Sequence, residues 1–172
     1  MIPIKLDDTH RDVEILARWL YGYRRLVWDD IPSRCEDEIQ DLINAHAFGR
    51  KRNIVPFMDK LLDELVDVMD SGYFYEDHSD GDLNLLISSF LKSFPPGSEG
   101  RQLLIHWLAY AEYVKPSAGI QTIGDNSFLN DLAAALMTSN GMDRGERREN
   151  FIDTCRIHEH TKRDEPCYTE ED

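Results

Sequence analysis

The chain has 172 residues, of which 41% are hydrophobic and 30% charged, and its formal net charge is -14. This length is enough for one domain with a sizeable core. A charge this negative argues against binding to a nucleic-acid backbone or to an anionic membrane surface, and no apolar run is long enough to span a membrane. Three cysteines without a secretory signal predict a cytoplasmic or nuclear protein with free thiols.

The first predicted elements are a strand and a helix. Ile2, Ile4 and Leu6 alternate with other residues, which predicts a short N-terminal strand. Apolar residues at helical spacing then predict a helix over 9–21 that ends at Tyr21-Gly22. Residues 24–32 are predicted to form a loop.

The longest periodic stretch, over residues 33–69, predicts two helices joined at a tight corner. We expect the first helix to end near Gly49, because glycine adopts the left-handed conformation that closes many helices. We expect Asn53 to be the N-cap of the second helix. That helix carries a broad apolar stripe that can anchor a core, formed by Val55, Met58, Leu61, Leu62, Leu65, Val66 and Met69.

Three further helices, and a short one near residues 147–155, are predicted in the second half of the chain. Apolar stripes indicate helices over 82–94 and 98–113, separated by Pro95-Pro96-Gly97. Asn126 or Ser127 is expected to cap the third.

These elements predict a mainly α fold, a compact array of six to seven helices with at most one short N-terminal strand. The central hairpin should pack against the 9–21 helix on one side and the next two helices on the other. Residues 1–70 would form a first unit, residues 71–142 a helical extension packed on it, and residues 143–172 a charged, partly disordered tail.

Acidic residues are concentrated after the corner of the hairpin. Between residues 59 and 82 there are nine acidic residues and one lysine. Asp63, Glu64, Asp67 and Asp70 lie on the second helix of the hairpin, and two interpretations stay open for them. They are either the solvated face of that helix or an acidic surface that docks a basic partner protein.

A cluster of zinc-ligand residue types lies near the C-terminus: Cys155, His158, His160 and Cys167. Two, one and six residues separate them, which is unlike paired zinc knuckles, so a packed tail is the first interpretation. A small zinc-binding regulatory protein is the alternative. His46 and His106 lie within apolar helices and are expected to be core histidines that are either hydrogen-bonded or partly exposed. Since no motif predicts a catalytic group, we expect a non-enzymatic protein without a cofactor.

Several segments together resemble one known family. Trp19-Leu20-Tyr21-Gly22 and residues 42–54 resemble, in order and spacing, the C-terminal half of BTB/POZ domains. Residues 95–104 and 155–160 are similar to a proline-glycine-serine turn and a terminal cysteine-histidine motif of fungal BTB-like proteins.

The resemblance implies a protein–protein interaction module, in the form of a truncated adaptor that binds an unidentified protein partner. The N-terminal half of a BTB domain, with much of its dimer interface, has no counterpart in this sequence. Dimerisation in the usual mode is therefore not expected, and an interface for a cullin-type ligase would be only partly present.

Overall fold

The computed structural model describes residues 10–27, 35–70, 80–110 and 124–143, together with residues 145, 146, 149 and 158. Its helices are α1 (His10–Leu20), α2 (Cys35–Arg52), α3 (Val55–Asp70), α4 (Asp80–Ser93), α5 (Glu99–Tyr110) and α6 (Asn126–Ser139). There is no strand among the described residues, so the predicted mainly α fold is confirmed. The strand predicted over residues 2–6 and, apart from residue 149, the short helix predicted near residues 147–155 lie outside them.

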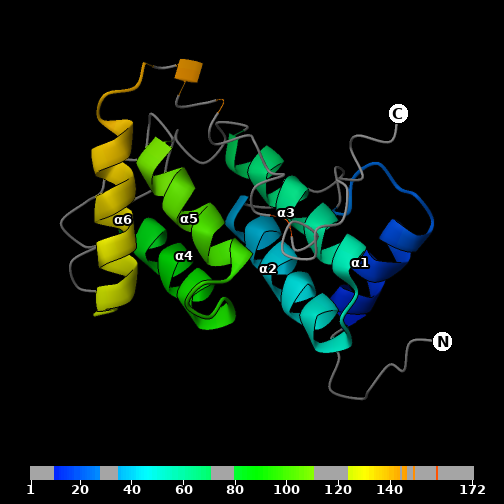
Figure 1. The fold of residues 1–172 in the computed structure, drawn as a ribbon. Coiled ribbons are helices and arrows are strands. Elements are labelled where there is room, and N and C mark those ends of the chain that lie inside the picture. The colour runs from blue at the N-terminus through cyan, green and yellow to red at the C-terminus, as the bar shows by residue number, and fades with distance from the viewer. Residues whose placement is uncertain are drawn as a thin grey trace.

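Each helix packs against one or more of the others (Figure 1). Helix α2 contacts α1, α3 and α4, while α5 contacts α3, α4 and α6. Figure 1 shows α1 and α6 at opposite ends of the molecule. The predicted packing is therefore confirmed, with α1 on one side of the α2–α3 hairpin and with α4 and α5 on the other.

One hydrophobic core extends through all six helices, from Ile15 in α1 to Leu132 in α6. Its largest fully buried side chains are Phe57, Phe90, Phe94, Trp107 and Phe128. Burying a side chain of this size contributes roughly 1.5–3 kcal/mol. The core therefore joins the first three helices to the last three in one body.

The corner between α2 and α3 differs from the prediction. Helix α2 continues through Gly49 to Arg52, and Asn53 adopts the left-handed conformation with a φ of 54°. The Asn53 N–H donates to the Arg50 carbonyl at 3.2 Å, and the Ile54 N–H donates to the Gly49 carbonyl at 3.1 Å. This is the Schellman pattern of a helix C-terminus. Asn53 therefore closes α2, and the expectation that it caps α3 is wrong.

Gly49 has a packing role instead of a terminating one. A Cβ atom at this position would lie 3.0 Å from the Phe57 ring and 3.1 Å from the Met58 side chain. The glycine thus allows α2 and α3 to approach each other closely just before the corner.

The N-cap of α6 is Asp125, not Asn126 or Ser127 as predicted. Its carboxylate accepts a hydrogen bond from the Phe128 N–H at 3.0 Å and forms an ion pair with Arg101 at 2.7 Å. The Phe128 N–H and, after it, Arg101 lower the pKa of Asp125. One carboxylate thus both starts α6 and attaches it to α5.

Candidate functional site

The chain reverses direction immediately after α1. Gly22 has a φ of 68°, and its N–H donates to the Trp19 carbonyl at 3.0 Å. The Tyr23 N–H donates to the Arg18 carbonyl, also at 3.0 Å. These bonds end the helix where the sequence predicted, at Tyr21-Gly22. They also place the Tyr23 ring near the last turn of α1, where its centroid lies 5.2 Å from the Arg18 guanidinium carbon.

The segment after α1 passes from solvent into the core. The side chains over 21–25 are exposed, whereas Leu26 and Val27 are buried. Those two apolar residues hold the turn against the core, so its exposed side chains project from an anchored segment. This anchor was not predicted from the sequence, which indicated only a loop over residues 24–32. An apolar pair following a run of tyrosine and arginine would have indicated it.

Two contacts hold α1 beside the hairpin. The Trp19 ring packs on Phe57 of α3, with centroids 5.3 Å apart. The Arg11 side chain donates to Asp41 of α2 at 2.7 Å. The end of α1 therefore has a defined position next to α3.

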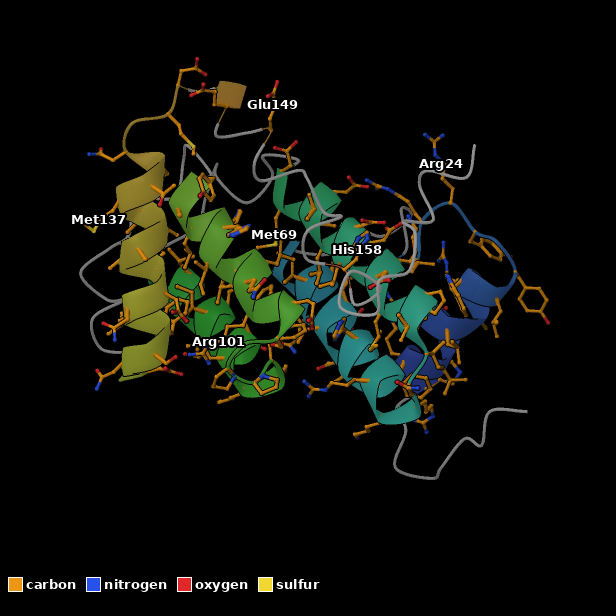
Figure 2. All side chains as sticks on the ribbon, in the orientation of Figure 1. Arg24, Met69, Arg101, Met137, Glu149 and His158 are labelled. Atoms are coloured by element: carbon orange, nitrogen blue, oxygen red, sulfur yellow. The ribbon has the colours of Figure 1, made fainter. Side chains whose placement is uncertain are left out.

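A groove of about 650 Å³ lies where this turn faces α3. It is lined by Arg18, Tyr23, Arg24 and Arg25 from the end of α1 and the turn, and by Lys60, Glu64 and Asp67 from α3. Glu64 is buried and pairs with Lys60 at 3.1 Å. Figure 2 shows Arg24 projecting outward from the segment that follows α1.

The described lining of the groove carries both signs of charge. Among the described residues, four cationic side chains and two carboxylates line it. Cationic side chains therefore outnumber carboxylates in this described lining, although an acidic surface was predicted on α3. The arginines and the charged residues of α3 are far apart in sequence, so their shared place in one groove could not be predicted without the fold.

The four residues of the predicted acidic surface have different environments. Asp67 is exposed and lines the groove, Asp70 is half-buried, and Glu64 is buried. Asp63 is half-buried, and its Oδ1 lies 2.9 Å from Nε2 of His158. Only Asp67 of the four is therefore exposed on α3.

His158 connects the C-terminal region to α3. Its side chain is fully buried, and its contact with Asp63 joins residues 95 positions apart (Figure 2). The other members of the Cys/His cluster, Cys155, His160 and Cys167, lie outside the described residues. No group of three metal-ligating side chains occurs among the residues that are described. The zinc-binding alternative therefore stays a prediction.

His46 lies in the core, as its place in an apolar helix predicted, but it is neither partly exposed nor hydrogen-bonded to a described residue, which corrects the rest of that prediction. It is 1% exposed, and its ring lies 4.8 Å from the Phe94 ring, centroid to centroid. Neither ring nitrogen has a hydrogen-bond partner among the described residues. Burial and, secondarily, the charge of Arg50 lower the pKa of His46 to about 4. The imidazole is therefore neutral at neutral pH and lies in the core, not in the groove.

Comparison with family models, with curated proteins and with solved structures gives no match to this chain. In the described part of the chain, each helix is too short or too polar to cross a bilayer.

Proposed function

We propose that this protein is a non-enzymatic protein–protein interaction module whose partner docks at the groove beside the end of α1. The observation that carries the proposal is the exposure of large side chains there. Tyr23 is 57% exposed beside Arg24, and the neighbouring Tyr21 is 82% exposed. Tyrosine and arginine are the residue types that most often dominate binding energy at protein interfaces.

The anchored turn supports the same proposal. Gly22 closes α1, and Leu26 and Val27 are buried directly after the exposed residues. A segment held in this way loses little conformational entropy when a partner binds, which leaves more of the contact energy as affinity. The exposed tyrosines are thus presented by a rigid support.

The resemblance to fungal BTB-like proteins favours an interaction role as well. Part of it is Trp19-Leu20-Tyr21-Gly22, which in this fold is the end of α1 and the start of the groove-forming turn. We propose a protein, not a nucleic acid, as the partner, and the cytoplasm or nucleus as the location.

Affinity purification of tagged variants from the native cells tests the proposal. Wild type is compared with Tyr23→Ser and with Met137→Ser, because Met137 is 82% exposed on α6, at the other end of the molecule. We expect quantitative mass spectrometry to show a set of proteins that is lost with Tyr23→Ser and kept with Met137→Ser. Identical recoveries from all three would show that this groove is not the docking site.

A further inference from the structure

We propose that the C-terminal region acts as an autoinhibitory strap, which His158 fastens to Asp63 on the α3 side of the groove. A partner docks fully only when this contact opens. The inference rests on the proposed interaction function and adds a means of regulating the same site.

The contact between His158 and Asp63 is the first argument. Nε2 of His158 lies 2.9 Å from Oδ1 of Asp63, and the two residues are 95 positions apart in the sequence (Figure 2). An ionised carboxylate only accepts hydrogen bonds, so the imidazole is the donor. Helix α6 packs on α5 at one end of the molecule, whereas His158 lies against α3. The chain that follows α6 therefore returns to the hairpin and is held there by a specific side-chain contact.

The burial of His158 is the second argument. Its side chain is 0% exposed. One face of a helix cannot enclose an imidazole ring on every side, so other atoms of the protein also cover the ring on the side that faces away from α3. The surface of α3 around Asp63 is therefore covered for as long as His158 is bound there.

The position of Asp63 on α3 is the third argument. Lys60 and Asp67 line the groove, and they are three residues before and four residues after Asp63 in the same helix. Side chains at these spacings are neighbours on the surface of a helix. A group bound at Asp63 thus stands at the edge of the groove, where a docked partner also needs room. Occupation of Asp63 by His158 and full docking therefore oppose each other.

The contact is also of a kind that opens and closes. Asp63 is 19% exposed, so water and competing groups reach its carboxylate although the histidine is covered. A single hydrogen bond to a charged group shifts an equilibrium by roughly tenfold to a hundredfold. That is enough to favour the closed strap and too little to make it permanent.

Hydrogen exchange of the purified full chain, followed by mass spectrometry, tests whether the contact holds the strap. His158→Ala and Asp63→Ala each remove one side of the contact. We expect each variant to speed exchange roughly threefold or more in peptides that contain residue 158. The double variant should add little to either, because both substitutions act on one contact. Circular dichroism confirms folding, and His158→Phe, which keeps a ring without the hydrogen bond, replaces His158→Ala if the alanine variant does not fold.

His10→Ala and Asp131→Ala are the matched controls. They make the same chemical changes at exposed residues of α1 and α6, outside the contact. Exchange around residue 158 should be the same in these variants as in wild type. The strap is refuted if His158→Ala and Asp63→Ala leave that exchange unchanged, if their effects add in the double variant, or if the controls have effects of the same size.

Acetylation of the same samples with an N-hydroxysuccinimide ester measures access to the groove. Lys60 reports on the groove, and Lys92, an exposed residue of α4 outside the groove lining, is the internal reference. We expect Lys60 to react roughly threefold faster or more in His158→Ala, as removal of a hydrogen bond of this strength allows, with no change at Lys92. Equal Lys60 rates in wild type and His158→Ala would overturn the proposal that the strap restricts the groove.

Affinity purification from the native cells then reads docking itself, with His158→Ala compared in the presence and absence of Tyr23→Ser. Proteins whose recovery depends on Tyr23 should be more abundant with His158→Ala than with wild type or His10→Ala. If their abundance is unchanged, the docking site stands and the autoinhibitory role is wrong. If no protein depends on Tyr23 in either background, the proposed function itself fails, and the exchange data still report separately whether the contact holds the strap.

Discussion

The buried imidazole of His46 should make the folded chain sensitive to mild acid. The ordinary pKa of histidine, 6.5, falls to about 4 in the fold, chiefly through burial and then through the charge of Arg50. Between these two values the unfolded chain binds a proton that the folded chain does not. The contribution of His46 to stability is therefore fully present above pH 6.5 and is progressively lost as the pH falls toward 4.

The size of the effect follows from the same two pKa values. Linkage gives a loss of about 2 kcal/mol at about pH 5 and about 3 kcal/mol at about pH 4. Domains of this kind are typically stable by only about 5–15 kcal/mol. Protonation of this one histidine thus removes a substantial part of the folding stability, at pH values where many carboxylates remain ionised.

Replacing His46 with leucine isolates this contribution. Leucine has a similar volume and neither binds a proton nor carries the two ring nitrogens that have no described partner. Urea unfolding followed by circular dichroism gives the free energy of unfolding of wild type and variant at about pH 7.5 and about pH 5. We expect wild type to lose about 2 kcal/mol more than His46→Leu between them.

His10→Leu is the control, because His10 is exposed at the start of α1. Its pH dependence should follow that of wild type. If His46→Leu also follows wild type, then His46 charges in the folded chain without penalty, and the reasoning from burial is refuted. An NMR titration of the His46 ring provides an independent reading of the same pKa.

Three substitutions test the packing. Leu62→Asp should abolish cooperative thermal melting, because Leu62 is 0% exposed and an unpaired buried charge costs several kcal/mol, whereas Met137→Asp should still melt sharply. Gly100→Ala should destabilise the fold by roughly 1–3 kcal/mol and so lower the melting temperature, because its Cβ would clash with the Phe94 ring; Gly141→Ala, with open space around it, serves as control, and equal effects would contradict the packing of Phe94 on α5. Asn53→Val should destabilise by roughly 1–2 kcal/mol through its left-handed backbone, while Asn53→Gly should not, and a stable valine variant would rule out that conformation.

The helices themselves could be predicted from sequence because their causes are local. Apolar residues three and four positions apart mark the buried face of a helix whatever it packs against. The prediction over 9–21 differs from α1 (His10–Leu20) by one residue at each end, and that over 82–94 starts two residues after α4 (Asp80–Ser93). Gly22 ends α1 as expected, since its left-handed turn is a property of glycine.

The helix boundaries at the corner could not be predicted in this way. Gly49 and Asn53 both tolerate the left-handed conformation, so local preference does not choose between them. In the fold, Phe57 and Met58 of α3 pack against Gly49 within α2, and Asn53 is the residue that takes the positive φ. Likewise, Asp125 is the cap of α6 in a fold that also brings Arg101 to it.

An acidic, mainly helical protein with a strong α2–α3 hairpin therefore follows from local patterns in the sequence. Where its charges lie relative to one another depends on the fold. Arg24 and Lys60 are far apart along the chain, and they line one groove because Trp19 packs on Phe57 and the turn after α1 folds back over α3. Net charge and apolar periodicity can be read along the sequence, whereas an electrostatic interaction depends on the distance between charges in space. For that reason, a chain of net charge -14 can bring four cationic side chains together among the described residues of one groove.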